Sequence, residues 1–140
     1  MNKTIENINE YINSKKEEML LMWNQFVSIE TGSNNKDGID ILANIIKKTL
    51  EKSGYGVRVK EVQDGGNTLY AVKKGNGNKK PVSIMGHMDT VFPKGTINKR
   101  PFTVKNGKVF GPGVLDMKGG LVVILYAVKA LNELGYNDRE

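Results

Sequence analysis

The sequence predicts a layered α/β fold, on three observations. Apolar residues recur at helical spacing through the first fifty positions and alternate with polar ones after Gly54. The short apolar run Val82–Met85, bounded by turn-forming residues, is typical of a buried central strand. A long apolar stretch, Lys118–Leu134, then predicts a buried helix. Helices and strands in this order pack as helical layers against a sheet.

The N-terminal third is predicted to be helical. Apolar side chains lie three or four positions apart between Thr4 and Ile29, which predicts one amphipathic helix or two. A polar loop follows, and Asp37 or Asp40 is expected to cap the next helix. That helix should end at Ser53–Gly54, because glycine readily adopts the left-handed conformation found at helix ends.

Two pairs of strands are predicted after this helix. Alternating residues at 55–60 and 69–71 indicate the first pair. Asn106–Gly107 predicts a tight hairpin between 102–105 and 108–110, since both turn residues tolerate positive φ. The second hairpin therefore precedes the long apolar helix.

The helix Lys118–Leu134 is apolar around most of its girth, which predicts burial against a sheet. The order of elements then predicts a further strand after Gly135. Without such a strand the sheet looks unfinished.

Composition excludes several kinds of site. The chain has 140 residues, enough for one domain of modal size or part of a larger one. It has no cysteine, which excludes disulfides, thiolate metal clusters and a cysteine nucleophile. Its single histidine excludes an all-histidine metal cage.

No membrane or nucleic-acid partner is expected. The N-terminus lacks the apolar region of a secretory signal, and the longest apolar run, Leu121–Val128, is far shorter than the roughly 20 residues that cross a bilayer. We therefore expect a soluble, cytoplasmic protein. The net charge of +6 comes from scattered lysine pairs without interleaved aromatic residues, which favours a solvated surface over a nucleic-acid site.

The first candidate site is Gly86-His87-Met88-Asp89-Thr90, just past the predicted central strand. Ligands of α/β sheets gather at the carboxyl ends of strands. His87 could bind a metal through one ring nitrogen while Asp89 holds the proton of the other. The alternative is a histidine that is simply hydrogen-bonded at a strand end.

The second candidate is Asp116, which lies between two glycine clusters just before the long helix. Its carboxylate could bridge two metal ions, and such ion pairs can activate one water. It could equally be a helix N-cap, because aspartate satisfies free N–H groups there.

Together these motifs resemble those of a known family. The stretches 86–93, 101–102, 107–113 and 116–120 are similar to those of the zinc-dependent aminoacylase and carboxypeptidase metallopeptidases, which include glutamate carboxypeptidases, acetylornithine deacetylases and succinyl-diaminopimelate desuccinylases. The sequences of residues 29–32 and of the stretches around Pro93 and Phe110 are most similar to those of the glutamate carboxypeptidase branch.

The resemblance implies roles for three residues. His87 would be a metal ligand, Asp89 would belong to the catalytic set by orienting the imidazole, and Asp116 would bridge two zinc ions, with cobalt or manganese as possible substitutes. The peptide bond after Asp116 is typically cis in that family. The expected reaction is hydrolysis of an amide bond, in a small peptide or N-acyl amino acid, next to a free carboxylate by a di-zinc-activated water.

The resemblance also implies the architecture. It predicts a three-layer α/β/α catalytic domain with a mixed, largely parallel central sheet, of which residues 1–140 would be the N-terminal segment. The family's later Glu-Glu pair is not matched by Glu140, and the lid or dimerisation domain, through which the full-length enzyme could form a homodimer, would lie outside the chain. This chain alone is therefore expected to be inactive. The alternative is a non-catalytic α/β binding or interaction module of the same architecture.

Overall fold

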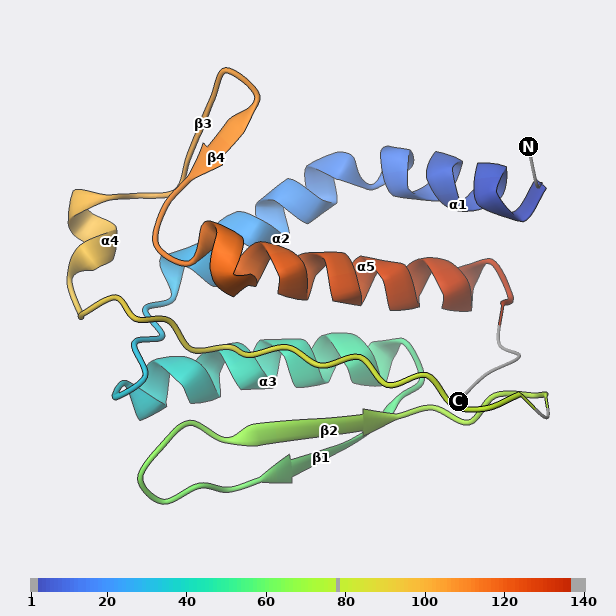
Figure 1. Cartoon of the computed structure of the whole chain (residues 1–140), viewed down its shortest axis with the longest axis horizontal. Helices are drawn as coiled ribbons and strands as arrows, with labels where there is room; N and C mark the ends of the chain where they lie inside the picture. Colours follow the sequence, from blue (N-terminus) through green and yellow to red (C-terminus); the bar gives the residue numbers. More distant parts are fainter. Residues whose placement is uncertain (1–2, 78, 137–140) are drawn as a thin grey trace.

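The computed structural model describes residues 3–77 and 79–136 (Figure 1). The predicted strand after Gly135 and the residue Glu140 therefore fall at or beyond the end of the described residues. The helices are α1 (Lys3–Ser14), α2 (Lys16–Ser28), α3 (Lys36–Lys52), α4 (Thr96–Lys99) and α5 (Gly119–Glu133). The strands are β1 (Gly56–Lys60), β2 (Thr68–Val72), β3 (Thr103–Lys105) and β4 (Lys108–Phe110).

The core lies between helices. Helix α5 runs between α1 and α2 on one side and α3 on the other, and the β1–β2 hairpin packs against α3 (Figure 1). Apolar side chains from α2, α3 and α5 form one cluster, in which hydrophobic burial holds the three helices together. Its buried members are Phe26, Leu42, Ile46, Leu121, Val122, Leu125 and Tyr126.

The predicted helices are confirmed, with one correction at a cap. The first apolar stretch forms two helices, α1 and α2, and α3 ends beside Gly54, whose φ is 81°. Neither Asp37 nor Asp40 caps α3. The helix begins at Lys36, so the N-cap is Asn35, whose side chain accepts from the Gly38 N–H at 3.2 Å.

The four predicted strands and the predicted hairpin at Asn106–Gly107 are confirmed. Strands β1 and β2 pair antiparallel from Gly56 opposite Val72 to Lys60 opposite Thr68. Strands β3 and β4 pair antiparallel around a turn in which Asn106 and Gly107 have φ values of 52° and 71°. These positive values are the ones that an Asn-Gly turn accommodates.

The predicted central strand at Val82–Met85 is wrong for the described residues. This run has no ladder partner there, and its side chains are exposed, Met85 to 88%. Both ladders are antiparallel, so the described residues do not form a largely parallel three-layer sheet. The physical reason is that a strand needs a hydrogen-bonded neighbour, and a cleft of about 950 Å³ separates this run from β2.

Burial of α5 also differs from the expectation. One face of the helix packs on the other helices and includes Leu125 and Tyr126, while Val123 is 60% exposed and Leu131 is 42% exposed. Neither described hairpin packs extensively on α5, so part of the circumference of the helix stays exposed. Within residues 3–77 and 79–136, no helix has the length and apolar character needed to cross a membrane.

Candidate metal centre

The segment that carries His87 and Asp89 is fixed to the loop between α2 and α3. The N–H of Thr90 donates to the carbonyl oxygen of Thr31 at 2.7 Å, and the N–H of Ser33 donates to that of Thr90 at 3.0 Å. Thr31 and Thr90 are buried. A Cβ on Gly32 would lie 2.7 Å from the carbonyl oxygen of Phe92, so the two segments approach as closely as they do only because residue 32 is glycine.

Asp116 lies in the turn Val114–Lys118, which leads into α5 and faces the segment that carries His87. Gly113 precedes this turn with φ of 72°, and a Cβ there would lie 2.6 Å from Cγ2 of Thr90. Lys118, which is 1% exposed, donates from Nζ to the carbonyl oxygen of Ile29 at 2.6 Å. The Asp116–Met117 peptide bond is cis, as the resemblance implies.

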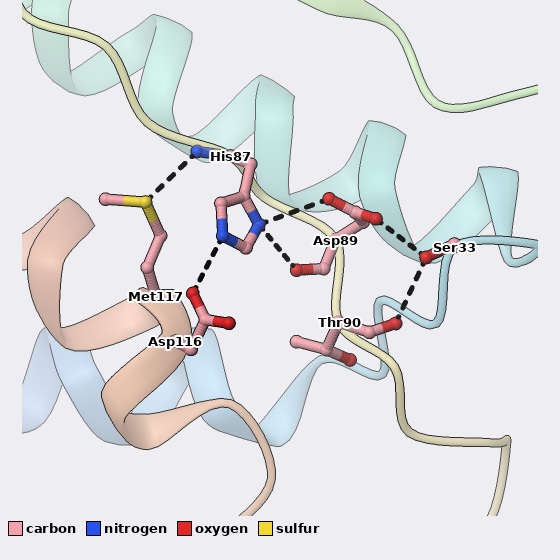
Figure 2. Close-up of polar contacts among 6 residues, drawn as sticks. All are labelled: Ser33, His87, Asp89, Thr90, Asp116 and Met117. Carbon is pink, nitrogen blue, oxygen red and sulfur yellow. Dashed lines mark hydrogen bonds and ion pairs between the residues drawn. The ribbon is translucent and has the colours of Figure 1, made fainter.

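The three predicted site residues meet (Figure 2). Nε2 of His87 lies 2.9 Å from Oδ1 of Asp116, 29 residues away in the sequence. Nδ1 of His87 lies 3.2 Å from Oδ1 of Asp89 and 3.0 Å from the Asp89 carbonyl oxygen. Because a carbonyl oxygen only accepts hydrogen bonds, Nδ1 carries a proton. Asp89 thus binds the imidazole at Nδ1 and leaves Nε2 directed at Asp116.

Electrostatics at this site favour a charged imidazole while no cation is bound. The hydrogen bond to Asp116 raises the pKa of His87 above its ordinary value, and the Asp89 carbonyl oxygen and the two carboxylate charges act in the same direction. Partial burial opposes them by lowering the pKa. A cation that binds Nε2 would therefore displace a proton.

One of the two simpler interpretations, a helix cap at Asp116, does not fit the structure. Asp116 does not cap α5, because Lys118 occupies the N-cap position and no side chain hydrogen-bonds there. His87 is hydrogen-bonded through both ring nitrogens, to Asp89 in its own segment and to Asp116 in the turn before α5. Its side chain is 47% exposed and that of Asp116 is 84% exposed, so a ligand can reach both.

Sequence reasoning missed two contacts at this site. Oγ of Ser33 donates to Oδ2 of Asp89 at 2.7 Å, and the N–H of His87 donates to Sδ of Met117 at 3.3 Å (Figure 2). Met117 lies within a recognised motif, but Ser33 is one polar residue in a polar loop. What distinguishes Ser33 from the other polar residues of this loop is its contact with Asp89, 56 residues away in the sequence.

The donor set fits part of a metal centre. An imidazole nitrogen and a carboxylate oxygen converge, and both groups are ordinary zinc ligands. A catalytic zinc site takes about three protein ligands for each ion. Within the described ranges, no group of three or more histidine, cysteine, aspartate or glutamate side chains is arranged to hold a metal ion. His87 and Asp116 therefore fit as two ligands of a larger set.

Comparison with known proteins agrees with these motifs. Residues 83–140 match peptidase family M20/M25/M40. The chain is 38% identical to carboxypeptidase G2 of a Pseudomonas species over 117 residues, which is 81% of this chain and 28% of that protein. It is 30% identical to acetylornithine deacetylase of Proteus mirabilis over 108 residues, 73% of this chain and 27% of that one.

The fold has a solved counterpart. The crystal structure of human carnosine dipeptidase 1 matches 93% of this chain and 31% of its own length, with a TM-score of 0.79 at 21% identity. The chain therefore shares the fold of that part of the dipeptidase.

The resemblance predicted from the motifs is confirmed: residues 83–140 match peptidase family M20/M25/M40, and the chain is similar to a carboxypeptidase and a deacetylase. It spans less than a third of the length of each of these relatives, which is consistent with the predicted N-terminal portion.

Proposed function

We propose that this chain supplies two ligands and one positioning carboxylate to a metal-dependent amide hydrolase. One observation carries the proposal: Nε2 of His87 and Oδ1 of Asp116 converge at 2.9 Å, while Asp89 holds the opposite ring nitrogen. The family match supports a hydrolase of the metallopeptidase or amidohydrolase type.

Each residue has a distinct task in this proposal. His87 and Asp116 would hold the cations, two zinc ions or in their place cobalt or manganese, with Asp116 as the bridging carboxylate. Asp89 fixes the tautomer and direction of the imidazole, because its carboxylate and its carbonyl oxygen both accept from Nδ1. When bound, the ions would polarise the amide carbonyl and lower the pKa of a water for attack.

The proposed substrate is a small peptide or N-acyl amino acid cleaved next to a free carboxylate. The names of the relatives support this class, because one is a carboxypeptidase and another removes an acetyl group from an amino acid. Both reactions break an amide bond beside a carboxylate. A homodimer belongs to the same proposal, through a lid or dimerisation domain in the longer enzyme.

We place residues 1–140 in the N-terminal segment of the catalytic domain, and the three-layer sheet in the longer polypeptide. The cleft supports this placement, since β2 lines one side and Pro81–Ile84 the other, and Leu121, Ile124 and Val128 of α5 form part of its lining. A strand added there would pair with both edges and cover the face of α5 that includes Leu131. The β1–β2 hairpin would then become part of the predicted mixed sheet.

Two measurements test the function. Residues 1–140 titrated calorimetrically with zinc chloride should bind weakly, lose that binding in His87→Ala, and fail to hydrolyse N-acyl amino acids. Extension of the reading frame past Glu140 should reveal a strand followed by Glu-Glu. The extended enzyme should then hydrolyse such substrates, and His87→Ala and Asp116→Ala should lose most of that activity.

Two results would contradict the proposal. Two tight zinc sites with hydrolysis by residues 1–140 alone would disprove the inactive segment. A natural stop codon at Glu140 would favour the non-catalytic binding or interaction module of the same architecture. The described residues contain two converging donor groups, which is all that such a module would retain.

A further inference from the structure

The loop between α2 and α3 brings a hydroxyl group to the carboxylate of Asp89. Oγ of Ser33 donates to Oδ2 of Asp89 at 2.7 Å and lies 3.4 Å from the carbonyl oxygen of Thr90 (Figure 2). The other carboxylate oxygen, Oδ1, accepts from Nδ1 of His87. Both oxygens of Asp89 are therefore engaged, one by the loop and one by the imidazole.

The position of this hydroxyl group is set by backbone contacts. The N–H of Ser33 donates to the Thr90 carbonyl oxygen at 3.0 Å, which fixes the residue against the segment that carries Asp89. The side chain of Asn35 donates to the carbonyl oxygen of Glu30 at 2.6 Å and caps α3, which closes the loop behind Ser33. A hydroxyl group held in this way costs little further entropy when it bonds a carboxylate.

Asp89 needs such support because its side chain is 42% exposed. An exposed carboxylate can rotate and exchange its partners for water, and its hold on Nδ1 would then weaken. A hydrogen bond to the second oxygen opposes that rotation, as outer hydrogen bonds do for metal-ligating histidines.

We propose that Ser33 is a positioning residue of this site: its hydroxyl group fixes the carboxylate of Asp89 and, through it, the tautomer and direction of His87. The inference rests on the proposed function for the purpose of this arrangement. The arrangement itself is independent of any bound ion, so the two can fail separately.

The experiment uses the only histidine in the chain, whose ring-nitrogen signals need no assignment. Long-range ¹H–¹⁵N spectra of residues 1–140, recorded where the imidazole is neutral, report the share of molecules with the proton on Nδ1. Ser33→Ala should lower the ratio of Nδ1–H to Nε2–H several-fold, because Asp116 then competes better for the proton at Nε2. Ser33→Thr, which keeps a hydroxyl group, should restore the ratio.

Two further variants bracket the effect. Asp89→Ala should produce the largest shift toward Nε2–H. Ser28→Ala should leave the spectrum unchanged, although it also removes an exposed hydroxyl group that hydrogen-bonds a side chain, Oδ1 of Asn24 at 3.2 Å. An unchanged tautomer ratio in Ser33→Ala would overturn the proposal, whatever happens with metal.

A calorimetric titration with zinc chloride separates this proposal from the proposed function. Ser33→Ala should weaken zinc binding by about tenfold, the lower end of what outer hydrogen bonds contribute to metal affinity. If Ser33→Ala shifts the tautomer ratio but the parent chain binds no zinc, the positioning role is supported and the metal site is not. Zinc binding with no tautomer shift would do the reverse.

Discussion

The two ends of one segment, residues 81–90, behave differently. At one end, Asp89 and Thr90 are fixed by hydrogen bonds to the loop between α2 and α3, and Thr90 is buried. At the other end, Val82 and Ile84 are 57% and 54% exposed beside the cleft. The sequence made a clear prediction for each end, a metal site at one and a buried strand at the other.

The difference lies in where the partners are. The site end is completed by residues of the described chain, namely Thr31, Ser33 and Asp116. The strand end requires a neighbouring strand, which the described residues do not supply. Geometry around His87 can therefore be in place before the sheet is complete.

The largest expected effect concerns the fixed end. In Gly38→Ala the new Cβ would lie 1.9 Å from the carbonyl oxygen of Glu30, so the loop between α2 and α3 must shift. We expect the free energy of unfolding to fall by about 3 kcal/mol, as in other overpacked sites. Urea denaturation measures this.

Gly56→Ala is the matched control for this loop. Its Cβ would meet the carbonyl oxygen of Val72 at 3.7 Å, an ordinary contact, and the change should stay within about 0.5 kcal/mol. Equal losses in the two variants would show that the loop is no more constrained than the hairpin.

A smaller effect concerns pH and the buried Lys118. Burial lowers the pKa of Lys118 from 10.5 to about 8, although the charge of Glu30 opposes this. Between these two values the unfolded chain binds more protons than the folded chain, so the free energy of unfolding should rise with pH. Urea denaturation between pH 8 and 9.5 should show the rise in the parent and its loss in Lys118→Met.

Lys48→Met, on the exposed face of α3, should keep the parent's dependence on pH. The measurement stops below pH 10, because burial raises the pKa of Tyr11 to about 12 and stability gained by that group is lost as pH rises through 10 to 12. If the parent's free energy of unfolding does not change between pH 8 and 9.5, burial does not lower the pKa of Lys118.

The smallest expected effect concerns the open end. Exposed apolar side chains along an unpaired segment favour association between copies, so sedimentation velocity of residues 1–140 should show concentration-dependent species. Lysines at two positions, Val82→Lys with Ile84→Lys, should shift the chain toward monomer. Leu21→Lys, on a 70% exposed residue of α2, should not.

A sharp monomeric peak and cooperative unfolding in the parent would contradict this expectation. The open end would then be stable in water without a partner.

Much of this molecule followed from the sequence. Local patterns predicted α1, α2, α3, α5, the four strands and the Asn106–Gly107 turn, but not the short helix α4, because helical spacing and turn chemistry act over a few residues. The family motifs predicted His87, Asp89 and Asp116 as site residues, and the structure brings these three side chains together. These parts depend on short stretches of sequence.

Tertiary structure decided the rest. The pairing of Ser33 with Asp89 links residues 56 positions apart, and no local pattern specifies it. Asn35 caps α3 because the helix begins at Lys36. The Asn35 side chain also donates to the carbonyl oxygen of Glu30, which holds it in the loop. The run Val82–Met85 has the composition of a central strand, but a strand forms only with hydrogen-bonded neighbours, which its own sequence cannot supply.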